Sequence, residues 1–228
     1  MRKAFVMTLV LSLAGAACAS KAATPTVDLK TEEQKTLYAL GLVMSDNLAT
    51  FNLSEADVEY VKAGFTDGAL KRKRQVEVSV YGPKLRELAQ SRSTAGAAVE
   101  KASGSEFLSK AALEKGAVKT PTGFVYQEIT PGHGGSPVAS DTVKVHYKGT
   151  LVDGTVFDSS IDRGQPAVFP LGQVIPCWTQ GVGMMKVGGK AKLVCPADLA
   201  YGDQGRPPQI KPGSTLVFEV ELLEIVKK

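Results

Sequence analysis

The sequence predicts an α+β protein in which an all-helical N-terminal half precedes a small antiparallel sheet with one short helix. Three observations lead to this prediction. Apolar residues recur every three or four positions over residues 31–116, which is the period of an amphipathic helix. Beyond residue 123 the period changes to two, as in half-buried strands. Turn-forming pairs such as Asp153-Gly154 and Pro212-Gly213 separate the strand-like runs.

Residues 1–19 have the form of a secretory signal peptide. Arg2 and Lys3 precede an apolar stretch that is too short to span a membrane comfortably, and small residues end it. Cleavage after Ala19 by the ordinary signal peptidase is one outcome. The other is a lipoprotein signal that ends before Cys18, whose thiol would then carry the lipid. Either signal exports the protein, so we expect it in the periplasm or at the outer membrane, in an oxidising compartment.

Helix signals begin after a flexible linker at residues 20–30. The sequence Thr31-Glu32-Glu33-Gln34 is a capping box at the start of a first helix, and Ser54 starts a second helix. A third helix is expected to begin near Pro83, because proline suits the first turn. We expect Gly104 to interrupt this third helix.

The first two helices are too short to build a closed core by themselves. They nevertheless share an apolar face, made by Leu37, Leu40, Met44, Leu48, Phe51, Val58, Val61 and Phe65. A second chain would cover such a patch, since monomers rarely expose large apolar surfaces. We therefore expect a homodimer through a helical domain at residues 31–92. A connecting helix at 93–116 would lead to a domain at 117–228, and a fragment beginning near Lys115 would be monomeric and still active.

Composition argues against several classes of function. A net charge of +4 is too small to indicate a nucleic-acid partner. Three Cys and two His leave little room for a structural zinc site, which usually needs four such ligands, so we expect no metal. The segment Gly183–Gly188 begins like a phosphate-binding loop, but Gly189 stands where lysine is required. A Cys–His nucleophile is compatible with the composition, although Cys177 and Cys195 have the sequence surroundings of structural residues.

Aromatic side chains gather at predicted strand ends of the second half, beside a few polar groups. They are Tyr147, Phe157, Phe169, Trp178, Tyr201 and Phe218. Any one of these rings could simply fill a small core. The whole set is harder to explain in that way, because Asp158 and the hydroxyl of Tyr201 need polar partners if they are buried.

Five sequence blocks of this half resemble, in order and spacing, the FKBP-type peptidyl-prolyl cis-trans isomerases. They are Val145–Gly149, Gly154–Ser160, Val174–Trp178, Leu199–Gly202 and Leu216–Leu223. The resemblance extends over roughly residues 123–228. The helical half resembles, more loosely, the dimerisation domain of the secreted bacterial members of this family that are similar to macrophage infectivity potentiator.

This resemblance implies an FKBP-like antiparallel sheet of five or six strands wrapped around one short helix, with an apolar pocket between them. The catalytic groups would be Asp158, the hydroxyl of Tyr201 and the backbone N–H of Ile175. The substrate-binding residues would be Tyr147, Phe157, Phe169, Val174, Trp178, Ile210 and Phe218. Macrolides similar to FK506 would act as inhibitors. Three residues depart from the family pattern and leave inhibitor affinity and sequence preference open, namely Ala167, Arg206 and Gln209.

The implied activity is the acceleration of X–Pro rotation in unfolded or nascent exported proteins. Rotation of a peptide bond costs about 18–20 kcal/mol because it breaks the amide resonance. A dry apolar pocket favours the twisted transition state, which has lost that resonance, and so requires no nucleophile, metal or cofactor. The alternative is a holdase chaperone of the cell envelope that acts through the helical domain. A purely structural surface protein is a third hypothesis, which a complete pocket does not favour.

Two cysteines are predicted to pair. Cys177 lies at the start of the predicted short helix and Cys195 at the end of a strand, and the compartment is oxidising. We expect a disulfide between them. The alternative is a pair of buried free thiols.

Overall fold

The computed structural model describes residues 27–226 of the chain. The chain divides into two compact units, one that ends at Ala39 and one that comprises Leu40–Lys228. The predicted signal peptide and Cys18 lie outside the described residues. Within the described residues, no helix is both long and apolar enough to cross a membrane.

The first two helices begin at the side chains that the sequence indicates. Helix α1 spans Glu32–Asp46, and the side chains of Thr31 and Gln34 each accept a hydrogen bond from the backbone N–H of the other. A short 3-10 helix, η1, spans Ala49–Phe51 and precedes α2, which spans Glu55–Ala69. At the start of α2, Ser54 and Asp57 form a second capping box. At each helix start, two backbone N–H groups are therefore satisfied locally.

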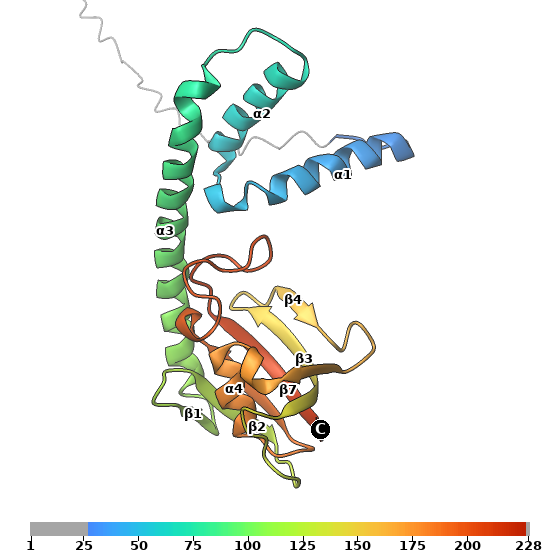
Figure 1. The fold of residues 1–228 in the computed structure, drawn as a ribbon, viewed down its shortest axis with the longest axis vertical. Helices are drawn as coiled ribbons and strands as arrows, with labels where there is room; N and C mark the ends of the chain where they lie inside the picture. Colours follow the sequence, from blue (N-terminus) through green and yellow to red (C-terminus); the bar gives the residue numbers. More distant parts are fainter. Residues whose placement is uncertain (1–26, 227–228) are drawn as a thin grey trace, which may run out of the picture. The chain divides into compact units, whose positions relative to one another are not determined.

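Helix α3 spans Val78–Ala111 as one helix of 34 residues (Figure 1). The expectations of a start near Pro83 and of a break at Gly104 are wrong. Pro83 lies in the second turn and removes only the one N–H that would have bonded to the carbonyl of Ser79. Gly104 is buried, and a Cβ at this position would lie 2.1 Å from Oγ1 of Thr215. The glycine is therefore a packing requirement of the helix and does not end it.

Helix α3 is tied to the start of α2 by a bidentate ion pair. Arg92 donates from Nη1 and Nη2 to the two carboxylate oxygens of Asp57, at 2.8 and 3.1 Å. The hydrogen bond from Arg92 is the main reason that the pKa of Asp57 lies well below its ordinary value, and Ser54 adds to the effect. The capping residue of one helix thus also anchors the next helix.

The described part of the C-terminal region forms one antiparallel sheet of seven strands. The strands are β1 (Ala117–Lys119), β2 (Val125–Thr130), β3 (Thr142–Leu151), β4 (Val156–Ser159), β5 (Ala167–Pro170), β6 (Lys190–Cys195) and β7 (Leu216–Val226). Their order is β1-β2-β6-β7-β3-β4, and β5 pairs with β3. The family resemblance implied five or six strands, and three of the seven, β1, β4 and β5, are only three or four residues long.

The two faces of the sheet have different partners. Helix α4 (Pro176–Gly183) packs with the larger apolar core, which includes the inward-facing residues of β3, β6 and β7. The opposite face carries Val125, Val194 and Val217, which pack against Leu108 and Ala111 of α3. The end of α3 therefore belongs to the core of the C-terminal domain. Two 3-10 helices, η2 (Leu171–Gln173) and η3 (Ala197–Leu199), lie in the connections.

Candidate functional site

A pocket of about 380 Å³ contains nine of the ten predicted catalytic and substrate-binding residues. Its lining consists of Tyr147, Phe157, Asp158, Phe169, Gln173, Val174, Ile175, Trp178, Tyr201, Arg206 and Phe218. Ile210 is not part of this lining, although it is buried in the same apolar core. Arg206, which the sequence marked only as a departure from the family pattern, and Gln173 contribute polar groups to the pocket.

Trp178 is the centre of an aromatic cluster that forms the pocket. Its ring centroid lies 5.2 Å from that of Tyr147, 5.7 Å from that of Phe169 and 5.3 Å from that of Phe218. All three pairs are edge-to-face, which is a favoured geometry for aromatic rings. The buried Nε1 of Trp178 has no hydrogen-bond partner among the described residues.

Local structure explains why these rings meet. Pro176 occupies the first turn of α4, where a proline needs no N–H partner, and this fixes the helix start two residues before Trp178. On the sheet, Gly149 of β3 lies opposite Phe218 of β7. A Cβ at Gly149 would lie 2.6 Å from Cζ of Phe157 and 3.0 Å from Cε1 of Phe218. This glycine leaves the space that two pocket rings occupy.

The polar side of the pocket is a network of three side chains. The hydroxyl of Tyr147 donates to Oδ2 of Asp158, and Arg163 donates to Oδ1 of the same carboxylate. Arg163 also donates from Nη2 to the Tyr147 oxygen, at 3.1 Å. Sequence reasoning placed Tyr147 only as a pocket wall and did not identify Arg163. One available signal was charge, since a carboxylate beside an apolar pocket needs a cation and Arg163 is the nearest basic residue along the chain.

This network determines the protonation states at the pocket. Burial alone would raise the pKa of Asp158, but the hydrogen bonds from Tyr147 and Arg163 outweigh burial and hold this pKa below its usual value. Burial, together with the bond to Asp158, raises the pKa of the Tyr147 hydroxyl. At neutral pH the pocket therefore contains an ionised carboxylate and a neutral phenol.

The other two groups that were predicted to be catalytic have no hydrogen-bond partner within the described residues. One is the hydroxyl of Tyr201 on the connection between β6 and β7, and the other is the backbone N–H of Ile175, which precedes α4. Unpaired donors beside a hydrophobic cavity are the groups that can fix the orientation of a ligand. They can donate to ligand carbonyl oxygens while the rings contact its apolar part.

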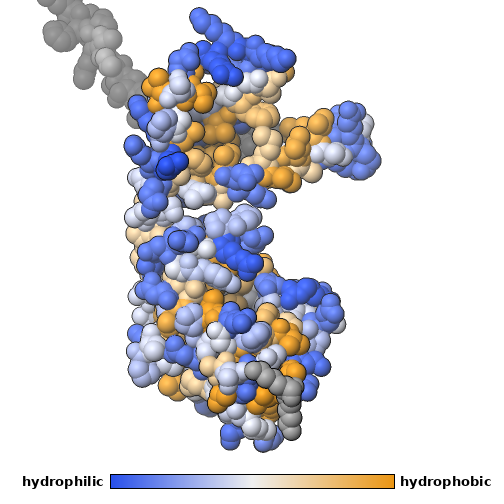
Figure 2. All heavy atoms as spheres, viewed as in Figure 1, coloured by the Kyte–Doolittle hydropathy of each residue, from blue (hydrophilic) through white to orange (hydrophobic). Residues whose placement is uncertain are grey.

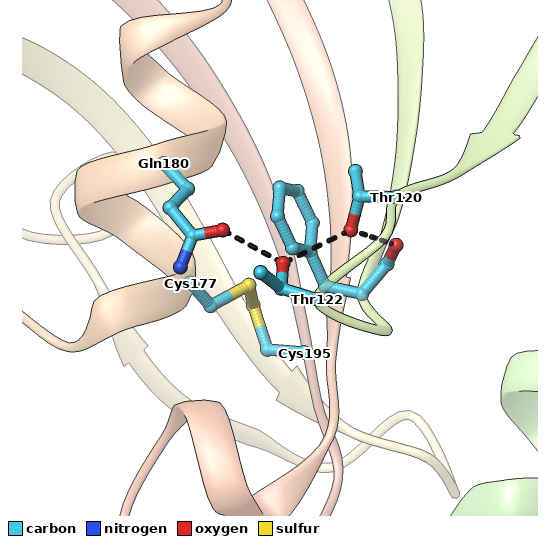
Figure 3. The surroundings of a disulfide bond; sticks show 6 residues. Thr120, Thr122, Cys177, Gln180 and Cys195 are labelled. Atoms are coloured by element: carbon cyan, nitrogen blue, oxygen red, sulfur yellow. Dashed lines mark hydrogen bonds between the residues drawn. A yellow bond between two sulfur atoms is a disulfide. The ribbon is translucent and has the colours of Figure 1, made fainter.

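A disulfide joins the helix of the pocket to the sheet (Figure 3). Cys177 of α4 and Cys195 of β6 are both fully buried, and their Cα atoms are 5.8 Å apart. On the same helix, Gln180 accepts a hydrogen bond of 2.7 Å from Thr122, in the turn before β2. Helix α4, which carries Trp178, is thus attached to the sheet at two points. Within the described residues there is no cluster of side chains suited to a metal ion.

Comparisons with known proteins agree with this arrangement. A family model described as FKBP-type peptidyl-prolyl cis-trans isomerase matches residues 134–223, and one described as the domain amino terminal to it matches residues 33–127. FkpA from Aeromonas hydrophila is 41% identical over 222 residues, which are 92% of this chain and 82% of the relative. The outer membrane protein MIP from Legionella longbeachae is 34% identical, covering 98% of this chain and 96% of the relative. The crystal structure of FkpA from Escherichia coli has a TM-score of 0.66 at 39% identity, covering 87% of this chain and 98% of that chain.

Proposed function

From the fact that this chain belongs to the FKBP-type peptidyl-prolyl cis-trans isomerases, we propose that it accelerates X–Pro rotation in unfolded or nascent exported proteins. The observation that carries the proposal is the aromatic pocket around Trp178, with the unpaired donors of Ile175 and Tyr201. X–Pro bonds are the natural substrate, because their cis form is populated and the uncatalysed exchange takes tens to hundreds of seconds. The predicted signal peptide supports an exported substrate and a location in the periplasm or at the outer membrane.

The pocket can act without covalent chemistry. A proline ring would occupy the apolar space beside Trp178, while Ile175 N–H and Tyr201 hydroxyl donate to carbonyl oxygens of the substrate. Excluding water favours the twisted amide over the planar amide, since twisting removes the resonance and reduces the amide dipole. Acceleration by about a thousandfold requires only about 4 kcal/mol of differential binding. Macrolides similar to FK506 would compete for the same space.

Asp158 supplies a fixed negative charge beside the rotating bond. Its orientation is set by Tyr147 and Arg163, so the carboxylate does not need to reorganise when the amide charge changes during rotation. The carboxylate is already occupied by these two donors. We therefore assign it an electrostatic role and no proton transfer.

An isomerase assay on a proline-containing tetrapeptide tests this function. Tyr201→Phe and Asp158→Leu should each lower kcat/KM by about threefold to tenfold, because each removes one polar interaction with the reacting amide. Tyr126→Phe is the matched control, since Tyr126 is a buried core residue that does not line the pocket. Circular dichroism checks that every variant is folded. Wild-type turnover in both pocket variants would contradict the assignment of the site.

A second candidate function is holdase activity in the helical region. An apolar groove of about 630 Å³ lies among residues 41–65, and Figure 2 shows hydrophobic residues gathered over these helices. Phe65, Leu48 and Val61 are among the residues that line it. Such a surface could hold an unfolded chain, or a second copy of this protein could cover it. Suppression of aggregation of a proline-free client by an isomerase-inactive variant would support the holdase function.

A further inference from the structure

The connection between β6 and β7 carries a key part of the pocket on a segment with little sheet support. Residues 196–215 follow β6 and contribute Tyr201 and Arg206 to the pocket lining. Inside the segment, Gly202 donates to the carbonyl of Ala197 at 2.8 Å, and Gly213 donates to that of Gly202 at 3.0 Å. These bonds shape the segment but do not attach it to the rest of the domain. Leu199, Ala200 and Tyr201 pack against the apolar core, and contacts with a second element add to this attachment.

Helix α3 supplies an electrostatic attachment on both sides of Tyr201. The ammonium of Lys101 lies 3.1 Å from Oδ1 of Asp198 and 2.7 Å from Oδ1 of Asp203. Asp198 precedes Tyr201 by three residues and Asp203 follows it by two. Both hydrogen bonds raise the pKa of Lys101, with Asp203 contributing most, so the lysine is charged throughout the neutral range. One side chain of α3 thus bridges the two ends of the turn that holds Tyr201.

The same face of α3 contacts the segment at its far end. Gly213 has a φ of +78°, and a Cβ there would lie 2.4 Å from the carbonyl oxygen of Ala97. At Gly104 of α3, an added Cβ would likewise lie only 2.1 Å from Oγ1 of Thr215. Between these points, Glu100 lies 3.6 Å from the ammonium of Lys211. Four positions of α3 over two turns therefore contact residues 196–215, and two of these contacts are close enough to require glycine.

We propose that α3 is part of the scaffold of the isomerase site and that Lys101 is a positioning residue, which acts by holding Tyr201 at the pocket through Asp198 and Asp203. The inference rests on the proposed isomerase function. Lys101 does not line the pocket, so its effect on catalysis passes through the segment that it holds. The helix that joins the two halves of the chain thereby contributes to substrate binding.

The test compares Lys101→Met with wild type in the full mature chain. Loss of the bridge should raise KM for a proline tetrapeptide by about twofold to fivefold, with a smaller change in kcat, because Tyr201 is then less well placed to bind substrate. Amide hydrogen exchange over residues 198–206 should become faster. Lys101→Arg, which keeps the positive charge, should have the KM and the exchange rates of wild type. Sodium chloride at high concentration should raise KM of wild type more than that of Lys101→Met, since salt screens exposed ion pairs.

The matched control is Lys110→Met. Lys110 is also on α3 and also forms an ion pair, but its partner is Glu106 on the same helix. KM and exchange should stay at wild-type values in this variant. The double variant Lys101→Glu/Asp203→Lys should reverse part of the rise in KM that Lys101→Glu causes.

Two outcomes would count against the proposal in different ways. Unchanged KM and unchanged exchange in both Lys101→Met and Asp203→Asn would overturn the positioning role. Asp203→Asn also provides the test if Lys101→Met does not fold. Absence of isomerase activity in wild type would instead overturn the proposed function, and hydrogen exchange would then decide the positioning role alone.

Discussion

The carboxylate of Asp158 remains ionised because two neighbouring side chains compensate for its partial burial. Tyr147 and Arg163 donate to different oxygens of the carboxylate, and their hydrogen bonds outweigh the effect of burial on its pKa. Tyr147 therefore has two roles, because its ring forms part of the wall and its hydroxyl orients the charge. The electrostatics of the pocket depend on a residue, Arg163, that lies outside the lining.

The pH dependence of kcat/KM should report this network. The pKa of Asp158 in the folded protein lies below its usual value. The carboxylate therefore stays ionised at pH values where a free carboxyl group becomes protonated, and it is protonated only at lower pH. We expect activity to be constant from neutral pH down through that range. In Arg163→Gln the guanidinium no longer lowers the pKa of Asp158, so this pKa rises. The loss of activity on acidification should then occur at a higher pH than in wild type. The measurement is kcat/KM against pH.

The control for this prediction is Lys148→Gln, which removes an exposed cation from the same strand as Tyr147. Its profile should follow that of wild type. An Arg163→Gln profile that coincides with wild type would show that Arg163 does not tune the carboxylate.

The residues of the pocket could be predicted from sequence to different degrees. Trp178, Asp158 and Tyr201 belong to short blocks whose order and spacing are distinctive. Arg163 could not be placed in the same way, because its contact depends on how the chain turns after β4. The role of Lys101 could not be predicted from sequence at all, since α3 contacts residues 196–215 only through tertiary packing.

At the scale of elements, local preference and tertiary packing disagree most clearly in α3. Glycine is among the least favourable residues in a helix interior, so sequence reasoning predicted a break at Gly104. The helix continues through this position, and the collision that a larger residue would make with Thr215 explains why glycine is present. The gain from packing α3 on the sheet exceeds the local cost of about 1 kcal/mol for a glycine. The helix pattern was thus predictable, while the reason for its continuity was not.

The disulfide between Cys177 and Cys195 should contribute to stability through the loop that it closes. The cysteines are 18 residues apart, and closing a loop of this length restricts the unfolded chain by about 3 kcal/mol in the chain-entropy model. Cys177→Ala/Cys195→Ala should therefore unfold at a lower urea concentration than wild type. A reductant should weaken wild type but leave the double variant unchanged.

Mass spectrometry of the unreduced native protein provides an independent check on this bond. After unfolding in urea without a reductant, neither Cys177 nor Cys195 should react with an alkylating agent, whereas free thiols would. Two reactive thiols at these positions would contradict the pairing, whatever the stability data show.

The packing of α3 also determines where an isolated isomerase domain can begin. A fragment that starts near Lys115 would lack Leu108 and Ala111, leaving Val125, Val194 and Val217 exposed. We expect it to be less stable than a fragment of residues 93–228 by about 2–4 kcal/mol, from the apolar surface that α3 covers. Urea unfolding of the two fragments measures the difference. Equal stability would show that α3 is dispensable for this core.

At the scale of the whole molecule, the apolar groove among residues 41–65 is a hydrophobic surface that no other described part of the chain covers. Met44, Val58 and Phe65 line it and are between 38 and 57% exposed. By contrast, the inner core of the C-terminal domain buries residues such as Val145 and Leu193 completely. A soluble monomer with this groove open would expose a continuous apolar surface, which is unusual for a folded protein. A second copy of the chain is the partner that we propose for it.

We predict that the mature protein is a homodimer at micromolar concentration and that Val61→Glu makes it monomeric. A glutamate in the groove would be buried without a partner charge on association, and this penalty opposes dimerisation. Val76→Glu is the matched control, because Val76 is an exposed valine that does not line the groove. Light scattering gives the mass of each variant, and the isomerase assay should give similar kcat/KM for wild type and Val61→Glu on a short peptide. A monomeric wild type would remove the dimer without affecting the isomerase assignment, whereas a dimeric Val61→Glu would place the interface elsewhere on the chain.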